Sequence, residues 1–175
     1  ALAETLGLLN SDRVLPRLTA MLGDADLRVV PSVLSTFVKL KAVNATKVLL
    51  DNLKSPDLVV RMTAARLIGE LKPDEGFQAL IEAYERGRDD SSYVAKAAIL
   101  SALAKYKGPE VVSNLKTALS DPDWAVRVSV ARQLFQLKDP IDATTLIRPV
   151  PVRFSDSVYE AKHLVSPTVS PHVYI

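Results

Sequence analysis

Hydrophobic residues recur at helical spacing from Ala1 to Lys138, and short polar or proline-containing breaks separate one apolar run from the next. Leu27, Val30, Leu34 and Phe37, for example, are three or four residues apart, which places them on one face of a helix. The same pattern predicts nine helices, over residues 1–9, 12–22, 26–41, 44–54, 57–71, 74–87, 91–106, 109–120 and 123–138. Pro16 falls inside the second of these helices and predicts a bend or a delayed start, and Pro31 falls inside the third and predicts a kink.

The chain also repeats itself. Aspartates recur at a constant 33-residue interval, and three of them are followed four residues later by an arginine. A fixed period of this size is typical of a helical solenoid. An aspartate at a helix start caps free backbone N–H groups, and neighbouring helices lie about 8–10 Å apart. We therefore predict an inter-repeat ladder of charges made by Asp24, Arg28, Asp57, Arg61, Asp90, Asp123 and Arg127. Val94 holds the arginine position of the third repeat, and Lys96 is the nearby candidate to replace it.

The overall composition argues against several classes of function. Hydrophobic residues make up 48% of the 175 residues and aromatic residues only 6%, as expected for a core of Leu, Val, Ile and Ala. The net charge of +2 is nearly balanced, which does not favour a nucleic-acid partner. No cysteine is present, and no apolar run reaches the ~18–20 residues of a membrane span.

No pattern of catalytic residues stands out. His163 and His172 are the only histidines, and no Asp/Glu pair lies at His-x-x-x-His-type spacing beside them. Glycine-rich phosphate loops and nucleophile motifs are also absent from the sequence. We therefore expect a non-catalytic chain that needs no metal and no cofactor, and we interpret Trp124 as a packing residue.

The C-terminal part of the sequence follows different rules. Residues 139–175 contain five of the eleven prolines and no glycine, so we divide the chain into a solenoid, 1–138, and an extended Pro-rich tail, 139–175. The tail is too apolar for a solvated linker, and we expect it to pack as a strap against the last repeats. The chain starts without methionine and ends on Val-Tyr-Ile, so we interpret it as part of a longer protein.

The sequence Asp57-Leu-Val-Val-Arg-Met-Thr-Ala-Ala-Arg-Leu-Ile-Gly resembles the short bacterial HEAT repeat, including the variety named after phycobilisome lyases. The resemblance covers roughly residues 1–138. It implies a right-handed α-α superhelix in which first helices lie outside and second helices line a concave groove. It also implies binding of proteins or peptides.

The tail carries a second resemblance. Residues 148–159 (RPVPVRFSDSVY) and 170–175 (SPHVYI) are similar to the connector that joins HEAT repeats to a cyclophilin-type peptidyl-prolyl isomerase in some bacterial proteins. This likeness implies a covalently linked catalytic domain that begins near Val173 and continues past Ile175. No catalytic position of that domain has a counterpart in this sequence.

The repeat spacing suggests which side chains line the implied groove. The position nine residues after each aspartate is held by Val33, Arg66, Ile99 and Arg132, and the position thirteen after by Phe37, Glu70, Leu103 and Gln136. We predict that Arg66, Glu70, Lys96, Arg132 and Gln136 form the binding site. The arginines would suit an acidic peptide or a carboxyl terminus. The alternative is that these charges are solvated or paired locally.

The hypothesis is therefore a protein- or peptide-binding scaffold that positions an isomerase domain. Two alternatives share the repeat: a HEAT-like DNA-binding or glycosylase module, and a phycobilin-lyase-like chaperone that would need a groove for a tetrapyrrole. Strong, salt-sensitive DNA binding would favour the first alternative.

Overall fold

A computed structural model describes residues 2–9, 12–88 and 92–138, and these residues contain helices and turns but no strand. Two short 3₁₀ helices, η1 (Asp12–Val14) and η2 (Leu27–Val29), accompany the α-helices. The α-helices are α1 (Leu2–Leu8), α2 (Leu15–Met21), α3 (Val30–Lys39), α4 (Ala45–Asn52), α5 (Leu58–Leu71), α6 (Asp74–Arg86), α7 (Tyr93–Ala104), α8 (Pro109–Ala118) and α9 (Trp124–Gln136).

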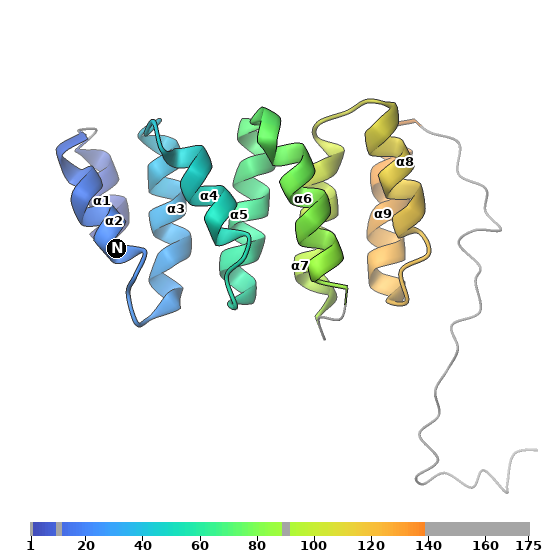
Figure 1. Cartoon of the computed structure of the whole chain (residues 1–175), viewed down its shortest axis with the longest axis horizontal. Helices are drawn as coiled ribbons and strands as arrows, with labels where there is room; N and C mark the ends of the chain where they lie inside the picture. Colours follow the sequence, from blue (N-terminus) through green and yellow to red (C-terminus); the bar gives the residue numbers. More distant parts are fainter. Residues whose placement is uncertain (1, 10–11, 89–91, 139–175) are drawn as a thin grey trace, which may run out of the picture.

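The helices stack in two layers (Figure 1). The inner layer holds α1, α3, α5, α7 and α9, each packed against the next, and the outer layer holds α2, α4, α6 and α8. Each outer helix runs antiparallel to the inner helix that follows it, so the inner helices are parallel to one another. The prediction of an all-α solenoid is confirmed for the described part of the chain. The predicted tail, 139–175, lies outside the described residues.

Pro16 and Pro31 do not bend their helices. Each occupies the first turn of its α-helix, and a 3₁₀ turn precedes that helix. Proline is well tolerated there because the first helical N–H groups have no partner within the helix. The predicted kink at Pro31 is therefore wrong, and the proline starts the α-helix instead.

The repeat interval in the structure alternates between 31 and 35 residues, whereas the aspartates recur every 33 residues. The N-cap positions of the inner-helix segments are Asp26, Asp57, Ser92 and Asp123, at steps of 31, 35 and 31 along the sequence. The residues that end these segments follow the same steps and share a left-handed backbone: Lys41, Lys72, Lys107 and Lys138, with φ between 51° and 61°. The inner helices of the first and third repeats are therefore shifted by two residues relative to the 33-residue spacing of the aspartates.

The core follows this corrected register. Three sets of equivalent positions are buried in α5, α7 and α9: Val60, Ala95 and Val126; Ala64, Ile99 and Val130; Ile68, Leu103 and Leu134. Burying a leucine or valine contributes roughly 1.5–3 kcal/mol. Because each set joins one repeat to the next, the stability of every repeat depends on its neighbours.

Small residues allow the inner helices to approach closely. A Cβ atom added to Gly69 on α5 would lie 2.8 Å from the Cα of Ala102 on α7. Similarly, a Cβ on Gly7 would lie 2.9 Å from a methyl carbon of Thr36, whose hydroxyl donates to the carbonyl oxygen of Ala3 at 3.2 Å. At both glycines the neighbouring inner helix leaves no room for an added side chain.

The free face of α9 is apolar. Trp124, Val128 and Phe135 are 63%, 48% and 78% exposed, although Phe135 is equivalent to the buried Gly69 and Ala104. The exposure of Trp124 contradicts its interpretation as a packing residue. In α5 and α7 the residues equivalent to Val128 and Phe135 are half-buried or buried, whereas Tyr93, the equivalent of Trp124 in α7, is also exposed. No inner helix follows α9 within the described residues.

Substitution of Gly69 by alanine tests the close packing. The added methyl group would overlap the backbone of Ala102, and overpacking of this kind costs about 1–3 kcal/mol. Even after the gain in helix propensity, we expect the free energy of unfolding measured with urea to fall by about 1–2 kcal/mol. Gly23→Ala is the control, because only one atom lies within 4 Å of the Cβ that it adds, and its effect should stay within about 0.5 kcal/mol. Equal effects would contradict the packing.

Candidate functional site

The candidate site is the exposed face of the inner helices that points away from the outer layer, here named the groove face. In the corrected register, three rows of equivalent positions run along it from α3 to α9. They are Ser32, Thr63, Ala98 and Ser129; Ser35, Arg66, Ser101 and Arg132; and Lys39, Glu70, Lys105 and Gln136. The first row is half-buried, and the third row is exposed throughout. The groove face thus has a floor of small, mostly polar side chains and a charged margin.

A hollow of about 330 Å³ opens on this face between α1, α3 and α5. Its lining combines small hydroxyl side chains with three charged ones: Glu4, Pro31, Ser32, Ser35, Thr36, Lys39, Thr63 and Arg66. Ser32 already donates a hydrogen bond to Glu4 at 3.2 Å, which links α3 to α1. This volume is at the lower end of the range for small-molecule pockets, and it also has room for one or two side chains of an extended peptide.

Four of the five predicted site residues lie on the groove face. Arg66 and Glu70 form an ion pair, with 2.8 Å between Nη1 and Oε1, and both side chains are about half exposed. An exposed pair of this kind contributes only about 0.3–0.5 kcal/mol, so a ligand could replace either partner at low cost. Arg132 and Gln136 are exposed at the equivalent positions of α9. Nearby, Gln133 donates a hydrogen bond to Ser101 at 3.1 Å and joins α9 to α7.

The other residues at the positions nine and thirteen after each aspartate do not lie on the groove face. Val33, Phe37, Ile99 and Leu103 are buried in the core, because α3 and α7 are displaced by two residues from the 33-residue spacing. Their places on the groove face are taken by Ser35, Lys39, Ser101 and Lys105, which the aspartate spacing does not identify. The signal that could have found them is the lysine that follows each inner helix, at steps of 31, 35 and 31 along the sequence.

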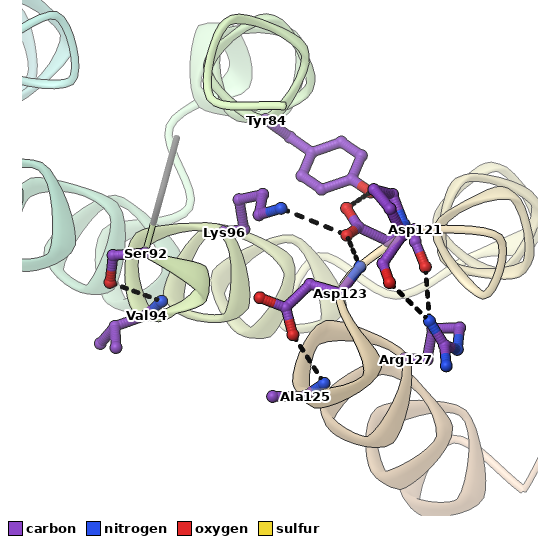
Figure 2. A network of polar contacts seen from close by, with 9 residues as sticks. Tyr84, Ser92, Val94, Lys96, Asp121, Asp123, Ala125 and Arg127 are labelled. Carbon is purple, nitrogen blue, oxygen red and sulfur yellow. Dashed lines mark hydrogen bonds and ion pairs between the residues drawn. The ribbon is translucent and has the colours of Figure 1, made fainter. Parts of the chain in front are cut away.

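Lys96 is not a groove residue. Its side chain is buried, and its Nζ lies 3.2 Å from Oδ1 of Asp121, in the loop between α8 and α9 (Figure 2). Lys96 follows the N-cap Ser92 by four residues, as Arg61 follows Asp57 and Arg127 follows Asp123. It therefore does occupy the arginine position of the third repeat, but it turns inward and bonds to the next repeat.

The arginines at this position close their own loops. Nη1 of Arg127 donates to the carbonyl oxygens of Asp121 and Pro122, both at 2.9 Å, and Nη1 of Arg61 donates to those of Ser55 and Pro56 at 2.9 and 3.0 Å. Each arginine makes both bonds through one nitrogen, Nη1, and a lysine ammonium also carries enough N–H donors for two carbonyls. Lys96 nevertheless bonds to the carboxylate of Asp121 in the next repeat.

Two of the helix caps that were predicted as part of the ladder are present. Asp57 and Asp123 cap α5 and α9 as predicted, accepting from the backbone N–H groups of Val60 and Ala125.

At the first repeat the ladder prediction is wrong. Asp24 accepts from the N–H of Asp26, and Asp26 is the cap. Arg28 pairs with Asp26 at 2.7 Å instead of with a neighbouring repeat, and this hydrogen-bonded pairing lowers the pKa of Asp26 to about 2. Asp90 lies outside the described residues, so the rungs from it to Arg61 and Arg127 stay predictions.

Asp121 is the centre of a buried polar network (Figure 2). Besides Lys96, it accepts hydrogen bonds from the hydroxyl of Tyr84 at 2.7 Å and the backbone N–H of Asp123 at 2.9 Å. Burial, reinforced by the hydrogen bond to this carboxylate, raises the pKa of Tyr84, so the phenol remains a donor at neutral pH. The network joins α6, α7 and the α8–α9 loop, and it fixes the fourth repeat against the third.

The groove face carries no arrangement typical of an active site. Among the described residues, no three His, Cys, Asp or Glu side chains cluster in a way that could hold a metal ion. Across the same residues, none of the helices is both long and apolar enough to cross a membrane. The chemistry that the face does offer is hydrogen bonding from small hydroxyls and ion pairing from arginine and lysine.

Removing the centre of the polar network should loosen the last repeat. Asp121→Ala leaves the buried ammonium of Lys96 without its carboxylate, and breaking a buried pair costs about 3–5 kcal/mol. We expect a loss of that size in urea unfolding. Asp51→Ala, at an exposed position on α4, is the control and should change stability by less than about 0.5 kcal/mol. A loss below about 1 kcal/mol at Asp121 would contradict the role of the network.

Comparison with known proteins agrees with this architecture. Residues 78–148 match the family model described as HEAT repeats, a span that runs from α6 through α9. No curated protein matches the chain. Together with the stacked helical pairs, the match supports a HEAT-like domain, and HEAT repeats generally act as protein-interaction scaffolds.

Proposed function

We propose that this chain is a non-catalytic scaffold whose groove face binds an extended protein segment. The observation that carries the proposal is the uninterrupted groove face itself, with its half-buried small residues and its exposed charged margin. Stacked helical repeats use such extended faces to bind partners, because the face lengthens with each repeat.

The groove face supplies two kinds of contact for a peptide. Ser32, Ser35 and Thr63 present hydroxyls around the hollow, and these can both donate to and accept from a peptide backbone. Arg66 and Arg132 lie in one row on α5 and α9, and each can bind a carboxylate through two parallel hydrogen bonds. An extended segment that spans several repeats could use both kinds of contact.

A peptide selection followed by a blocking substitution tests this function. Peptides of twelve to fifteen amino acids would be selected from a random library on the whole chain, and the affinity of the selected peptides would be measured by fluorescence anisotropy. Ser35→Trp should fill the hollow and weaken binding at least about tenfold, which is the effect of losing about 1.4 kcal/mol. Lys47→Trp, at an exposed position on the outer helix α4, is the matched control. Selected peptides that bind both variants as well as the unchanged protein would contradict the groove face as the site.

We further propose that the chain is the accessory region of a cyclophilin-type peptidyl-prolyl isomerase. The support is the resemblance of residues 148–159 and 170–175 to the connector in such proteins, and these residues lie outside the described part. An isomerase assay on the parent protein, with residues 1–138 alone as the control, tests it. Activity in the parent alone agrees with the proposal, and an inactive parent contradicts it.

The exposure of Trp124 favours the DNA-binding alternative, and an experiment can test it. An exposed tryptophan can stack on an unpaired base, as in a HEAT-like DNA-binding module. A DNA mobility-shift assay at about 50 and about 200 mM salt would separate the two functions. Tight binding that falls steeply with salt would favour the DNA module over the peptide scaffold.

A further inference from the structure

Lysine occupies the same unusual backbone position at the end of every inner helix from α3 to α9. Lys41, Lys72, Lys107 and Lys138 have φ of 52°, 51°, 61° and 58°, in the left-handed region where glycine is the usual residue. A side chain with a Cβ is disfavoured there. The chain nevertheless keeps a long cationic side chain at all four positions.

These four lysines lie along one edge of the molecule. The inner helices are parallel, so their C-terminal ends form the upper edge in Figure 1. All four lysines are exposed, and within the described residues none of their ammonium groups has an ion-pair or hydrogen-bond partner. We name Lys41, Lys72, Lys107 and Lys138 the lysine edge.

Four basic residues of the groove face precede the lysine edge on the same inner helices. Lys39 and Lys105 lie two residues before lysines of the edge, and Arg66 and Arg132 lie six residues before them. Glu70 is the acidic residue in the second and third rows of the groove face, and it is already paired with Arg66. The acids that follow the edge in sequence, Asp74, Glu75 and Glu110, lie in the first turns of the outer helices α6 and α8.

Charge is therefore unevenly distributed in a chain that is nearly neutral. Eight of the 22 basic and four of the 20 acidic residues belong to the lysine edge, to the groove-face positions named above, or to the first turns of the outer helices that begin at the same end. The other 14 basic and 16 acidic residues of the chain carry a net charge of −2. Such an edge attracts acidic partners and repels basic ones, even though the net charge of +2 suggests no preference.

We propose that the lysine edge binds an acidic, extended polypeptide that lies along the solenoid with one carboxylate near each repeat. This inference rests on the proposed scaffold function and names the chemistry of its partner. Neighbouring inner helices are about 8–10 Å apart, and an extended chain advances about 3.3 Å per residue. Acidic residues at every third position would therefore match successive lysines.

A purely structural explanation of the lysines makes a different prediction. A cation at a helix C-terminus interacts favourably with the helix dipole, so the lysines could serve their own helices alone. Replacement by glycine separates the two explanations, because glycine adopts the left-handed conformation more easily than lysine does. The substitution removes the charge without disturbing the backbone.

The test compares the unchanged protein with the variant Lys41→Gly/Lys72→Gly/Lys107→Gly/Lys138→Gly. The probe is a fluorescein-labelled twelve-residue peptide with Glu at every third position and Ser elsewhere, measured by anisotropy at about 50 and about 200 mM salt. We expect the unchanged protein to bind this peptide, more weakly at the higher salt, and the variant to bind at least about tenfold more weakly. The melting temperature of the variant should be unchanged or higher.

Three controls decide what each result means. Lys47→Gln/Lys54→Gln removes two exposed lysines of the outer helix α4 and its end, and binding should persist. A peptide with Lys in place of Glu should not bind. A twelve-nucleotide single strand of DNA that binds better than the acidic peptide would overturn the inference in favour of nucleic acid.

The inference and the scaffold function can fail separately. If library-selected peptides bind and are blocked by Ser35→Trp, but the glycine variant binds the acidic peptide as well as the unchanged protein does, the lysine edge is not the site and the scaffold function stands. If neither kind of peptide binds, both fail.

Discussion

Close packing between neighbouring inner helices is the constraint on which the rest of the structure depends. No helical pair of this chain can bury its apolar residues alone, and each set of core positions, such as Ala64, Ile99 and Val130, continues from one repeat into the next. At the contact between Gly69 and Ala102, even a methyl group has no room. The packing of the parallel inner helices decides which side chains face outward together.

The polar interactions fix the register and leave most of the stability to apolar burial. Asp57 and Asp123 begin their helices by capping them, and Arg61 and Arg127 close the preceding loops by binding two carbonyls each. In the third repeat, Lys96 holds the same position but bonds to Asp121 of the next repeat. The same helix-end geometry that closes each repeat also places one lysine per repeat on a common edge.

Most of the architecture could be predicted from sequence because apolar spacing and aspartate caps are local signals. The 33-residue spacing brings Arg66, Glu70, Arg132 and Gln136 to the groove face because the second and fourth repeats follow it. This spacing does not identify Ser35, Lys39, Ser101 and Lys105, since the N-caps of the first and third repeats lie two residues after Asp24 and Asp90. Aspartate occurs on both sides of a loop, so its spacing alone does not show which residue is the cap. The burial of Lys96 depended on a tertiary partner, Asp121, that lies 25 residues further along the chain.

The register of the third repeat is the central claim, and cysteine labelling measures it directly. The chain has no cysteine, so a single one can be introduced by Ile99→Cys or by Ser101→Cys and its reaction with a thiol reagent followed under native conditions. The structure predicts rapid labelling at position 101, on the groove face, and labelling at position 99 that is slower by orders of magnitude, because Ile99 is only 2% exposed. Faster labelling at 99 than at 101 would restore the uniform 33-residue register and contradict the site derived from the shifted one.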